Sequence, residues 1–458
     1  MSTGRSPVPQ AFTQRLQQQF PDLAEEVLSL LNTEGKTSIL INALKATSTV
    51  PPGTPVPWYF NGSILNERII FAADPLWHAG TYYVQEASSM LLGYVLEKLK
   101  NVPENPKALD LCAAPGGKSH IIQNYLKDKG LLWANEIHPG RAKILQQNIS
   151  RFGHASVVVS NADPTQLATQ NIQFDIVVVD APCSGEGMFR KDDTARNEWN
   201  TGLPEMCASR QQDILESASS LVAESGYLVY STCTFAEEEN ILQMARLMDE
   251  GGWTCCTPPG PEGVACYEIA KGPVRGLQMF PGLNNAGEGF FIAVLQKIYR
   301  EEGKSSKRSS NNDFTRFKHA FDEVTGKWRL QGLQTSFWQD KKGAVSLWNE
   351  EVESVVQRLT GNVKILQAGV PFATVKGSSY IPEHALALSV YRNNEIPFAD
   401  LDLEDAKKYL RGNDTGRHLF EQEGWNLVSY KSFALGWVKV LPGRVNNYYP
   451  KEQRLLHY

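Results

Sequence analysis

Between residues 107 and 296 the sequence alternates short apolar runs with helical patterns, and this alternation constrains the fold more than any other feature. The runs are continuously apolar, as strands are when helices cover both faces of a parallel sheet. The segments between them, such as 138–151 and 206–223, have helical spacing. The pattern predicts an α/β fold on a mostly parallel sheet. The runs are KALDLC, GLLWANE, ASVVVS, FDIVVVD, GYLVYST and GFFIAVL.

A chain of 458 residues exceeds what one core holds, so several domains are expected. Apolar side chains recur at helical spacing over 10–32, with a break at Pro21, and short strands with ordered loops are expected over 51–85. The predicted division is an N-terminal subdomain (1–100), a central α/β domain (101–300), a linker without large apolar side chains (301–313) and a C-terminal α+β module (314–458).

The composition, with 42% hydrophobic and 21% charged residues, is that of an ordinary globular protein. No run approaches the roughly 20 apolar residues of a membrane span, and the N-terminus has no apolar signal core, so we expect a cytoplasmic protein without a membrane partner. Seven cysteines without Cys-x-x-Cys spacing fit a reducing compartment and predict no metal site. The net charge of −5 means that any affinity for nucleic acid must come from local patches.

The last 34 residues form one such patch. Cationic side chains neutralise phosphates and aromatic faces stack on bases, so this composition suits single-stranded or looped RNA. A solvated basic face over an aromatic core is the alternative explanation. The side chains are Lys431, Lys439, Arg444, Lys451 and Arg454, interleaved with Tyr430, Phe433, Trp437, Tyr448 and Tyr449.

The segment KALDLCAAPGGKS (107–119) predicts a strand, a loop of small residues and the start of a helix. Gly116 and Gly117 let backbone N–H groups approach a ligand at the positive end of that helix. Glu136 follows the next strand, where a carboxylate can accept both hydroxyls of a ribose, and Asp163 follows the third, where it can accept from an adenine amino group. Each carboxylate alone also fits a helix cap, but together with the glycines they favour an adenosyl ligand.

Two cysteines follow two further strands: Cys183 in DAPCSGEG and Cys233 in YSTCTF. Carbon 5 of cytosine is too electron-poor to attack a methyl sulfonium, and a thiolate that adds to carbon 6 converts the ring into an enamine that can. We therefore expect Cys233 as the nucleophile, Asp180 at ring N3 and Cys183 assisting release, with the target base flipped or unpaired. A helix beginning near Ala236 is expected to favour the thiolate. Two buried structural cysteines are the alternative.

Four motifs, DLCAAPGGKS, NEIHPGRAK, DAPCSGEGMFRKD and YSTCTFAEEEN, together resemble the NOL/NOP/Sun family of RNA cytosine-5 methyltransferases. The resemblance runs from about residue 10 to 298 and implies a Rossmann-like class I methyltransferase with a seven-stranded, mostly parallel sheet and S-adenosylmethionine as cofactor. It implies that Cys233 is the nucleophile and that Cys183 assists release. It also implies cofactor contacts from Cys112, Ala113, Ala114, Pro115, Gly116, Gly117, Lys118, Glu136, Arg141, Asp163 and Asp180.

Beyond the linker, AGVPFATVKGSSYIPEHALAL and ALGWVKVLPGRVNNYYPKEQR resemble the C-terminal extension of the bacterial branch that modifies small-subunit (16S) ribosomal RNA. Relatives carry a PUA-like RNA-binding fold there, so ribosomal RNA or the small subunit is the expected partner, and transfer RNA is the chief rival. One departure is Gly282, where relatives more often have His. A noncatalytic ribosome-assembly factor remains an alternative. A nicotinamide-dependent oxidoreductase is disfavoured because GxGxxG is missing. We expect a monomer.

Overall fold

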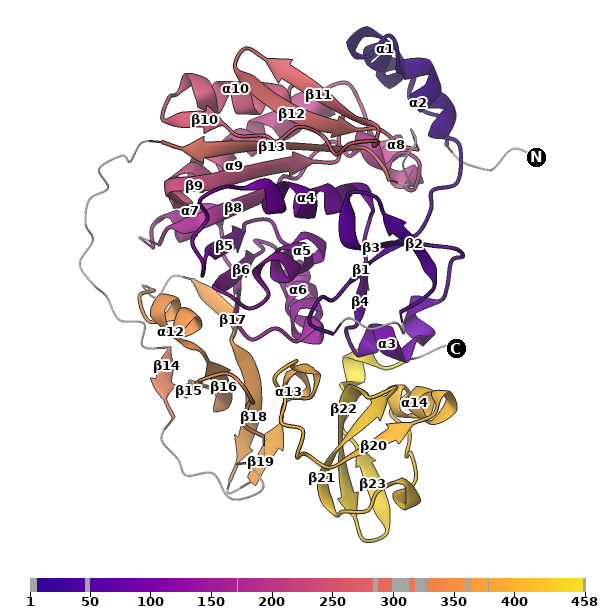
Figure 1. Cartoon of the computed structure of the whole chain (residues 1–458), viewed down its shortest axis with the longest axis vertical. Coiled ribbons are helices and arrows are strands. Elements are labelled where there is room, and N and C mark those ends of the chain that lie inside the picture. Colours follow the sequence, from indigo (N-terminus) through magenta and orange to yellow (C-terminus); the bar gives the residue numbers. More distant parts are fainter. Residues whose placement is uncertain are drawn as a thin grey trace.

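Figure 1 shows the computed structural model of the chain, in which one large sheet lies above two smaller C-terminal sheets and beside a small N-terminal sheet. None of the helices in the described part of the chain is long and apolar enough to cross a membrane. The structure describes residues 6–45, 50–170, 172–282, 287–298, 313–317, 326, 328–359, 363–377 and 379–455.

The central sheet is built on the six predicted apolar runs, all of which are confirmed as strands. Five are parallel and adjacent in the order β7-β6-β5-β8-β9, and β13 is antiparallel to β9. The carboxyl ends of the parallel strands therefore meet at one edge, where such sheets bind ligands. Their bounds are β5 Lys107–Asp110, β6 Leu131–Asn135, β7 Val157–Asn161, β8 Phe174–Asp180, β9 Val222–Thr232 and β13 Phe290–Lys297.

The sheet extends beyond the seven strands that the resemblance implies, to ten. Adding β12 (Val274–Met279) to the six runs gives the seven-stranded, mostly parallel core; β11 (Cys266–Lys271) and β10 (Trp253–Cys255) widen that end. At the opposite end β17 (Lys364–Ala368) pairs antiparallel with β7. A strand of the predicted C-terminal module thus lies in the central sheet and covers backbone groups that β7 would otherwise leave unpaired.

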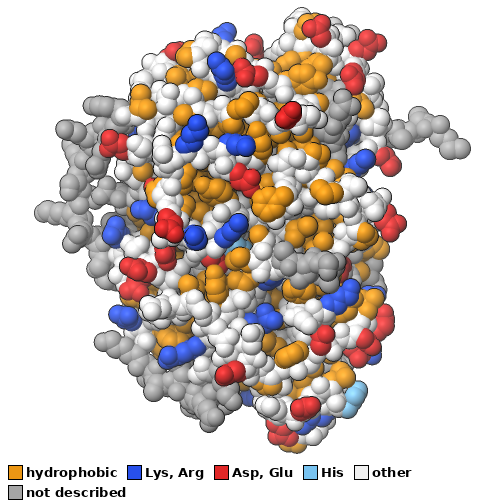
Figure 2. Space-filling model, viewed as in Figure 1, with side chains coloured by type: hydrophobic (Ala, Val, Ile, Leu, Met, Phe, Trp, Pro, Cys, Tyr) orange, Lys and Arg blue, Asp and Glu red, His pale blue; other side chains and the backbone are white. Residues whose placement is uncertain are grey.

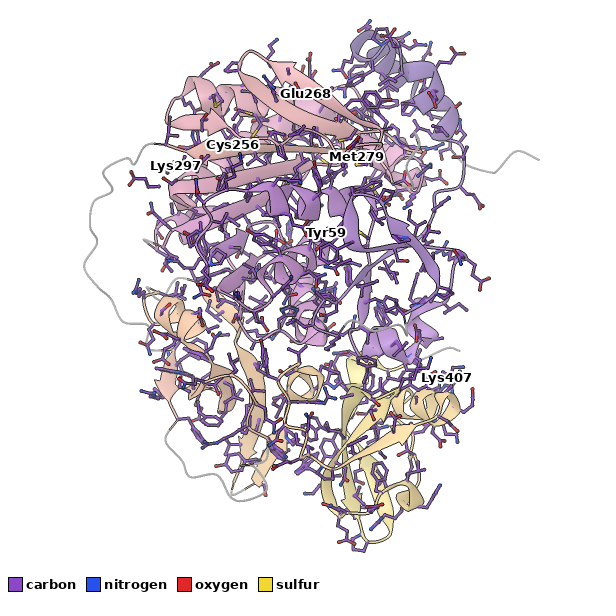
Figure 3. All side chains as sticks on the ribbon, in the orientation of Figure 1. Tyr59, Cys256, Glu268, Met279, Lys297 and Lys407 are labelled. Atoms are coloured by element: carbon purple, nitrogen blue, oxygen red, sulfur yellow. The ribbon has the colours of Figure 1, made fainter. Side chains whose placement is uncertain are left out.

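Helices cover both faces of the sheet, as parallel strands require. On one face pack α4 (Leu91–Lys98), α5 (Gly117–Leu126) and α6 (Pro139–Phe152), and the core beneath them includes Tyr59 and Met279, which Figure 3 labels. The other face is covered by α7 (Pro164–Ala168), α9 (Leu203–Leu221), α10 (Ile241–Asp249) and α12 (Glu350–Val356).

The N-terminal helix breaks as predicted around Pro21, into α1 (Gln10–Gln19) and α2 (Ala24–Leu30). Phe12 and Leu16 of α1 are buried against Phe189, Trp199 and Phe235, which belong to the segments that carry the two predicted catalytic cysteines. The N-terminal sheet has the order β2-β3-β1-β4, and α3 lies between β3 and β4 in the chain. The remaining bounds are β1 Ser38–Ile41, β2 Gly53–Val56, β3 Tyr59–Leu65, β4 Tyr82–Val84, α3 Pro75–His78 and α8 Asp193–Glu198.

The region after the predicted linker contains two sheets, with orders β14-β15-β16-β18-β19 and β20-β21-β22-β23. The linker predicted at 301–313 lies outside the described residues except for Asp313. The bounds are β14 Phe314–Arg316, β15 Ser336–Asp340, β16 Ala344–Trp348, β18 Val370–Lys376, β19 Ser379–Pro382, α13 His384–Leu388, β20 Phe398–Leu401, α14 Leu403–Leu410, β21 Gly424–Tyr430, β22 Phe433–Leu441 and β23 Arg444–Asn447.

Candidate active site

A cavity of about 1040 Å³ opens at the carboxyl edge of the central sheet, beside β5, β6 and β7. Four of the residues predicted to bind the cofactor line it: Cys112, Glu136, Arg141 and Asp163. Helix α9 forms the opposite wall, and Pro182, next to Cys183, lies at one end. The cavity is therefore continuous with the segment that carries one of the two thiols.

The loop between β5 and α5 needs glycine at two successive positions. Gly116 takes a left-handed φ of 117° as it caps α5, and a Cβ on Gly117 would lie 2.1 Å from Oε1 of Gln85. The preceding turn is held by Arg141, whose Nη2 donates to the Ala114 carbonyl over 2.7 Å. Ala113 donates its N–H to the Asn135 carbonyl, which fixes the loop to β6.

Glu136 is almost fully buried at the end of β6. Its Oε1 accepts the backbone N–H of His138 over 2.8 Å, and Nη1 of Arg141 lies 3.5 Å from Oε2. Arg141 thus contacts both the glycine loop and this carboxylate. One carboxylate oxygen keeps acceptor capacity toward the cavity, which suits a vicinal diol.

Asp163 has a local structural role as well as its place in the cavity wall. It begins α7 as its N-cap, and its Oδ1 accepts from the backbone N–H and the hydroxyl of Thr165. Gln166 closes the capping box by accepting the Asp163 N–H. Asp163 therefore caps α7, which was the alternative explanation for this carboxylate, and it also lines the cavity.

Asp110 is a buried carboxyl to which the sequence interpretation gave no role. Ser119 donates to its Oδ2, while Oδ1 has no hydrogen-bond partner in the described part of the chain. Burial raises the pKa of Asp110 to about 7. An orphaned carboxyl oxygen beside Lys118, Glu136 and Asp180 fits a ligand that brings a cationic group, as the amino acid portion of S-adenosylmethionine does. Its position at the end of the first strand was the signal that could have identified it.

Asp180, at the end of β8, pairs with Lys118 from the start of α5. The Lys118 Nζ lies 2.7 Å from Asp180 Oδ2, and Ser231 donates to Oδ1 over 3.0 Å. Burial by itself lowers the pKa of Lys118, but the attraction of Asp180, Cys233 and Asp110 outweighs it and the pKa is raised. Lys118 therefore carries a firm positive charge close to Cys233.

The two predicted catalytic thiols lie side by side. The Sγ atoms of Cys183 and Cys233 are 3.1 Å apart, both thiols are free, and the Cys233 N–H donates to the Cys183 Sγ. The hydrogen bond with Cys233, together with burial, raises the pKa of Cys183 well above its usual value. Cys183 is thus held as a neutral thiol in contact with the other sulfur.

The helix predicted to begin near Ala236 is absent there, and this expectation was wrong. Residues 236–240 form turns, and α10 begins only at Ile241. A hydrogen bond stabilises this segment instead: the Asn240 side-chain amide donates to the Thr234 carbonyl. The Lys118 ammonium takes the place of a helix N-terminus as the positive group beside Cys233.

Gly282 has a conformation that disfavours the histidine expected from relatives. Its φ is 73°, and a Cβ would lie 2.9 Å from Nη1 of Arg190. Arg190 forms a bidentate ion pair with the buried Glu288 and donates to the Gly287 carbonyl. The Arg190 guanidinium thus stands next to the position that a larger residue at 282 would need.

The basic and aromatic C-terminal patch is partly core. Trp437 and Tyr449 are buried, whereas Tyr448 is 37% exposed. Lys439 places its ammonium 5.4 Å from the Trp425 ring, and Lys431 lies at the same distance from Tyr430. The alternative explanation, a basic face over an aromatic core, therefore holds for the buried rings, and RNA binding by the exposed side chains stays a prediction.

Comparison with known families gives matches over most of the chain. Residues 98–296 match the family described as 16S rRNA methyltransferase RsmB/F. Residues 8–87 match the N-terminal domain of 16S rRNA methyltransferase RsmF, and residues 397–455 match the methyltransferase RsmF PUA domain. The PUA match covers β20 to β23 and stops short of the preceding sheet.

Curated relatives are similar over nearly their whole length. Ribosomal RNA small subunit methyltransferase F from Escherichia coli O139:H28 is 28% identical over 97% of this chain and 96% of that protein. The protein of the same name from Shigella boydii serotype 18 is 27% identical with the same coverage.

Solved structures share the fold. A methyltransferase homologue from Pyrococcus horikoshii has a TM-score of 0.54 at 23% identity, covering 63% of this chain and 95% of that one. NSun6 from Pyrococcus horikoshii with SFG has a TM-score of 0.52 at 20% identity, covering 64% and 99%. These matches confirm the resemblance seen in the motifs, and the chain belongs to the family described as 16S rRNA methyltransferase RsmB/F.

Proposed function

We propose that this protein transfers a methyl group from S-adenosylmethionine to carbon 5 of a cytosine in 16S ribosomal RNA, with Cys233 as the covalent nucleophile. The observation that carries the proposal is the 3.1 Å contact between Cys183 and Cys233 at the sheet edge, beside the Lys118–Asp180 pair and the cavity. A single structural cysteine needs none of these neighbours. Two adjoining free thiols suit chemistry in which one sulfur bonds to the base and the other helps it leave.

Residues that line the cavity, and others next to it at the sheet edge, fit the cofactor, which supplies the methyl group when bound. Glu136 suits the ribose hydroxyls and the rim at Asp163 suits the adenine amino group. The orphaned Asp110 oxygen suits a cation, and the α5 N-terminus with Gly116 and Gly117 suits the carboxylate. Cys112 to Lys118, Arg141 and Asp180 complete the proposed wall.

The chemistry then follows from what each side chain can hold or move. The Cys233 sulfur adds to carbon 6 of the unpaired cytosine, and the electron pair moves toward ring N3, where the Asp180–Lys118 pair holds a proton. After carbon 5 has gained its methyl group, the carbon 5 proton leaves and the bond between sulfur and carbon 6 breaks. Cys183, kept as a thiol by its hydrogen bond to Cys233, gives its proton to the departing sulfur and, as the resulting thiolate, takes up the carbon 5 proton.

The full chain with S-adenosylmethionine and radiolabelled methyl provides the test. We expect Cys233→Ala to lower methyl transfer to RNA at least about a thousandfold. Cys183→Ala should instead accumulate a protein–RNA adduct that survives denaturing electrophoresis. Cys266→Ala, a change at β11 away from the cavity, is the matched control and should behave as wild type. Methylation that survives loss of Cys233 contradicts the proposal.

The substrate is tested by offering the same enzyme naked 16S ribosomal RNA, small ribosomal subunits and transfer RNA, followed by bisulfite mapping of the product. The names of the relatives and the PUA match support ribosomal RNA. Methylation of transfer RNA alone would contradict this part of the proposal. Binding of RNA without methylation of any of the three would favour an assembly factor.

We also propose a division of labour along the chain. Residues 101–300 form the catalytic domain, 1–100 and 314–458 contact RNA, 301–313 connect them, and the protein acts as a cytoplasmic monomer. The support is the contact of α1 with the cysteine segments and the cation–aromatic pairs of the C-terminal sheet. Figure 2 shows basic and acidic side chains interspersed over one face of the molecule, so RNA contacts there depend on local pairs of this kind.

A further inference from the structure

A row of four buried oxygens runs behind the two thiols. Glu239 Oε1 lies 2.5 Å from Ser184 Oγ, Ser184 Oγ lies 2.8 Å from Thr234 Oγ1, and Thr234 Oγ1 lies 2.9 Å from Glu186 Oε2. All four residues are buried. Ser184 directly follows Cys183 and Thr234 directly follows Cys233, so the row ties together the two backbone segments that present the sulfurs.

The row has three contacts, and the two hydroxyl groups supply only two hydrogens. If both carboxyls were ionised, one contact would bring together two oxygens with no hydrogen between them. Thr234 Oγ1 also accepts the backbone N–H of Ala236, so its own hydrogen goes to Glu186. A third hydrogen, carried by one of the carboxyls, completes the row.

The surroundings show which carboxyl is ionised. Glu186 forms an ion pair with Arg15 of α1 and accepts N–H groups from Trp199 and Phe235 in addition to the Thr234 hydroxyl. Four donors, one of them a guanidinium, stabilise a negative charge. Glu186 is therefore the accepting end of the row.

Glu239 has the opposite environment. Its Oε2 accepts from the Ser184 N–H and from Nε2 of Gln211, each over 2.9 Å, which leaves Oε1 to carry a hydrogen toward Ser184. Burial raises the pKa of Glu239 to about 7, and the charge of Glu186 acts in the same direction.

The ionisable groups around Glu239 come from several elements. Cys183 and Glu186 lie on the segment after β8, Cys207 on α9, and Tyr230 and Cys233 on or just after β9. Arg210 of α9 faces Cys207, and Arg15 of α1 is engaged by Glu186. Among these groups, Glu186 opposes a negative charge on Glu239. The charge of Glu239 in turn raises the pKa of Cys183, Cys207 and Tyr230.

We infer that a proton held on Glu239 completes a hydrogen-bond chain through Ser184 and Thr234 to Glu186, and that this chain sets the spacing of the two thiols. Glu239 is thus a positioning residue. Loss of its proton removes the hydrogen between Ser184 and Thr234, the two residues that directly follow the cysteines. The bonds of Thr234 and Phe235 to Glu186 and of the Cys233 N–H to Cys183 remain, so one of several links between the two cysteine segments is lost. The catalytic meaning of this spacing rests on the proposed function, but the spacing itself is measured without RNA or cofactor.

The test uses the full chain and a diazenedicarboxamide oxidant, whose N=N bond takes up the two thiol hydrogens and two electrons as Cys183 and Cys233 join in a disulfide. Mass spectrometry of the linked peptides follows the rate from about pH 6 to about pH 9. The comparison is with Glu239→Gln, because an amide keeps a donor toward Ser184 at every pH. The ratio of the two rates cancels the ionisation that the thiols would have without Glu239. The Glu239 charge also raises the pKa of Cys183, and variants of Thr234, which leave that carboxyl in place, separate this effect from the hydrogen-bond chain.

We expect this ratio, Glu239→Gln over wild type, to stay near one at low pH and to rise as Glu239 loses its proton. Thr234→Val, which removes the middle hydroxyl, should slow the link about tenfold at low pH, and Thr234→Ser should restore it. Ser219→Ala is the matched control, since that hydroxyl only bonds within α9. A flat ratio, or a Thr234→Val rate equal to wild type, overturns the inference.

The outcome is independent of whether RNA is methylated. If the ratio rises but no methyl transfer to any RNA is found, the hydrogen-bond chain stands and the proposed function fails. If methyl transfer is found and the ratio is flat, the proposed function stands and the hydrogen-bond chain fails. In methylation assays the same Glu239→Gln protein should retain activity at higher pH than wild type, provided that both ideas are correct.

Discussion

Two polar clusters, one acidic and one basic, lie largely buried in this molecule. The first, the acidic cluster, comprises Asp110, Glu136, Asp180, Glu186 and Glu239 around the sheet edge and the thiols. The second, the basic junction, comprises Lys45, His78, Arg151, His384 and Arg392 where the N-terminal sheet, α6 and the C-terminal sheets meet.

The basic junction pairs several of its groups with backbone and neutral partners. Lys45 donates to the carbonyls of Ala79 and Arg151, and the Arg151 guanidinium lies 4.0 Å from the centre of the Trp77 ring. The Nδ1 atom of His78 and the Tyr449 hydroxyl share a hydrogen bond of 2.7 Å. Burial lowers the pKa of Lys45 and of both histidines, so the imidazoles are held neutral.

The acidic cluster holds ion pairs with Lys118 and Arg15, and burial raises the pKa of Asp110 and Glu239, which form no ion pair in the described part of the chain. The comparison shows that burial opposes charge of either sign. Whether a charge survives depends on a counterion. The two clusters should therefore respond to opposite changes of pH.

The largest expected effect comes from removing the counterion in the acidic cluster. Lys118→Met keeps the length of the side chain but leaves Asp180 without its cation and the thiol without a nearby positive charge. We expect single-turnover methyl transfer to fall about a hundredfold. Lys129→Met removes an exposed lysine paired with Glu104 and should change nothing. Equal rates for Lys118→Met and wild type would show that the cation has no role in the chemistry.

The next effect concerns stability in acid. Burial lowers the pKa of His78 to about 4 and that of His384 to about 3, against 6.5 in the unfolded chain. Below pH 6.5 the two imidazoles bind protons in the unfolded chain but stay neutral in the folded protein. The free energy of unfolding therefore falls as the pH decreases toward 4. At pH 5 each histidine costs about 2 kcal/mol. Denaturant unfolding of the C-terminal region at pH 7 and pH 5 measures this loss.

His384→Phe isolates one of the two contributions. Neither ring nitrogen of His384 has a hydrogen-bond partner in the described part of the chain, and its ring packs edge-on against Tyr449. A phenyl ring keeps the packing and cannot take up a proton. The variant should lose about half of the acid sensitivity and keep wild-type methyl transfer at pH 7. If the free energy of unfolding of the variant depends on pH as that of wild type does, His384 does not contribute to the loss of stability in acid.

The smallest effect is expected at Asp163, a carboxylate at the rim of the acidic cluster that already has partners. Asp163→Ser keeps a cap on α7 and removes the charge, whereas Asp163→Ala removes both. We expect both variants to bind S-adenosylhomocysteine about fivefold more weakly by calorimetry, with Asp163→Ala alone losing about 1 kcal/mol of stability. If Asp163→Ser binds as wild type does, the carboxylate is only a cap.

Much of the central sheet could be predicted because buried parallel strands leave long apolar runs and their order fixes where loops meet. The positions of Cys183 and Cys233 at one edge followed from that rule alone. Partners that come from distant segments could not be predicted in this way. Arg15 reaches Glu186 across 171 positions, and Glu239 was hidden in the run EEE, whose members look alike in sequence although Glu239 alone is fully buried.

Local propensity also misplaced one helix start and could not reveal the partner of one predicted strand. Residues after Cys233 read as a helix start, but the bonds that Thr234 makes to Ser184 and Glu186 hold that segment in turns until Asn240. Residues 364–368 read as a strand of a separate module, and only the open edge of β7 gives them their place in the central sheet. In both cases a contact between distant segments outweighs the local pattern.

The pairing of β17 with β7 has a consequence for how the protein is made. The ribosome completes every other strand of the central sheet before it reaches residue 364, and until then the row of N–H and C=O groups on the outer side of β7 has only water to bond. The nascent enzyme is therefore most prone to self-association just before the strand that closes its sheet emerges. A chain shortened before residue 364 remains permanently in that state.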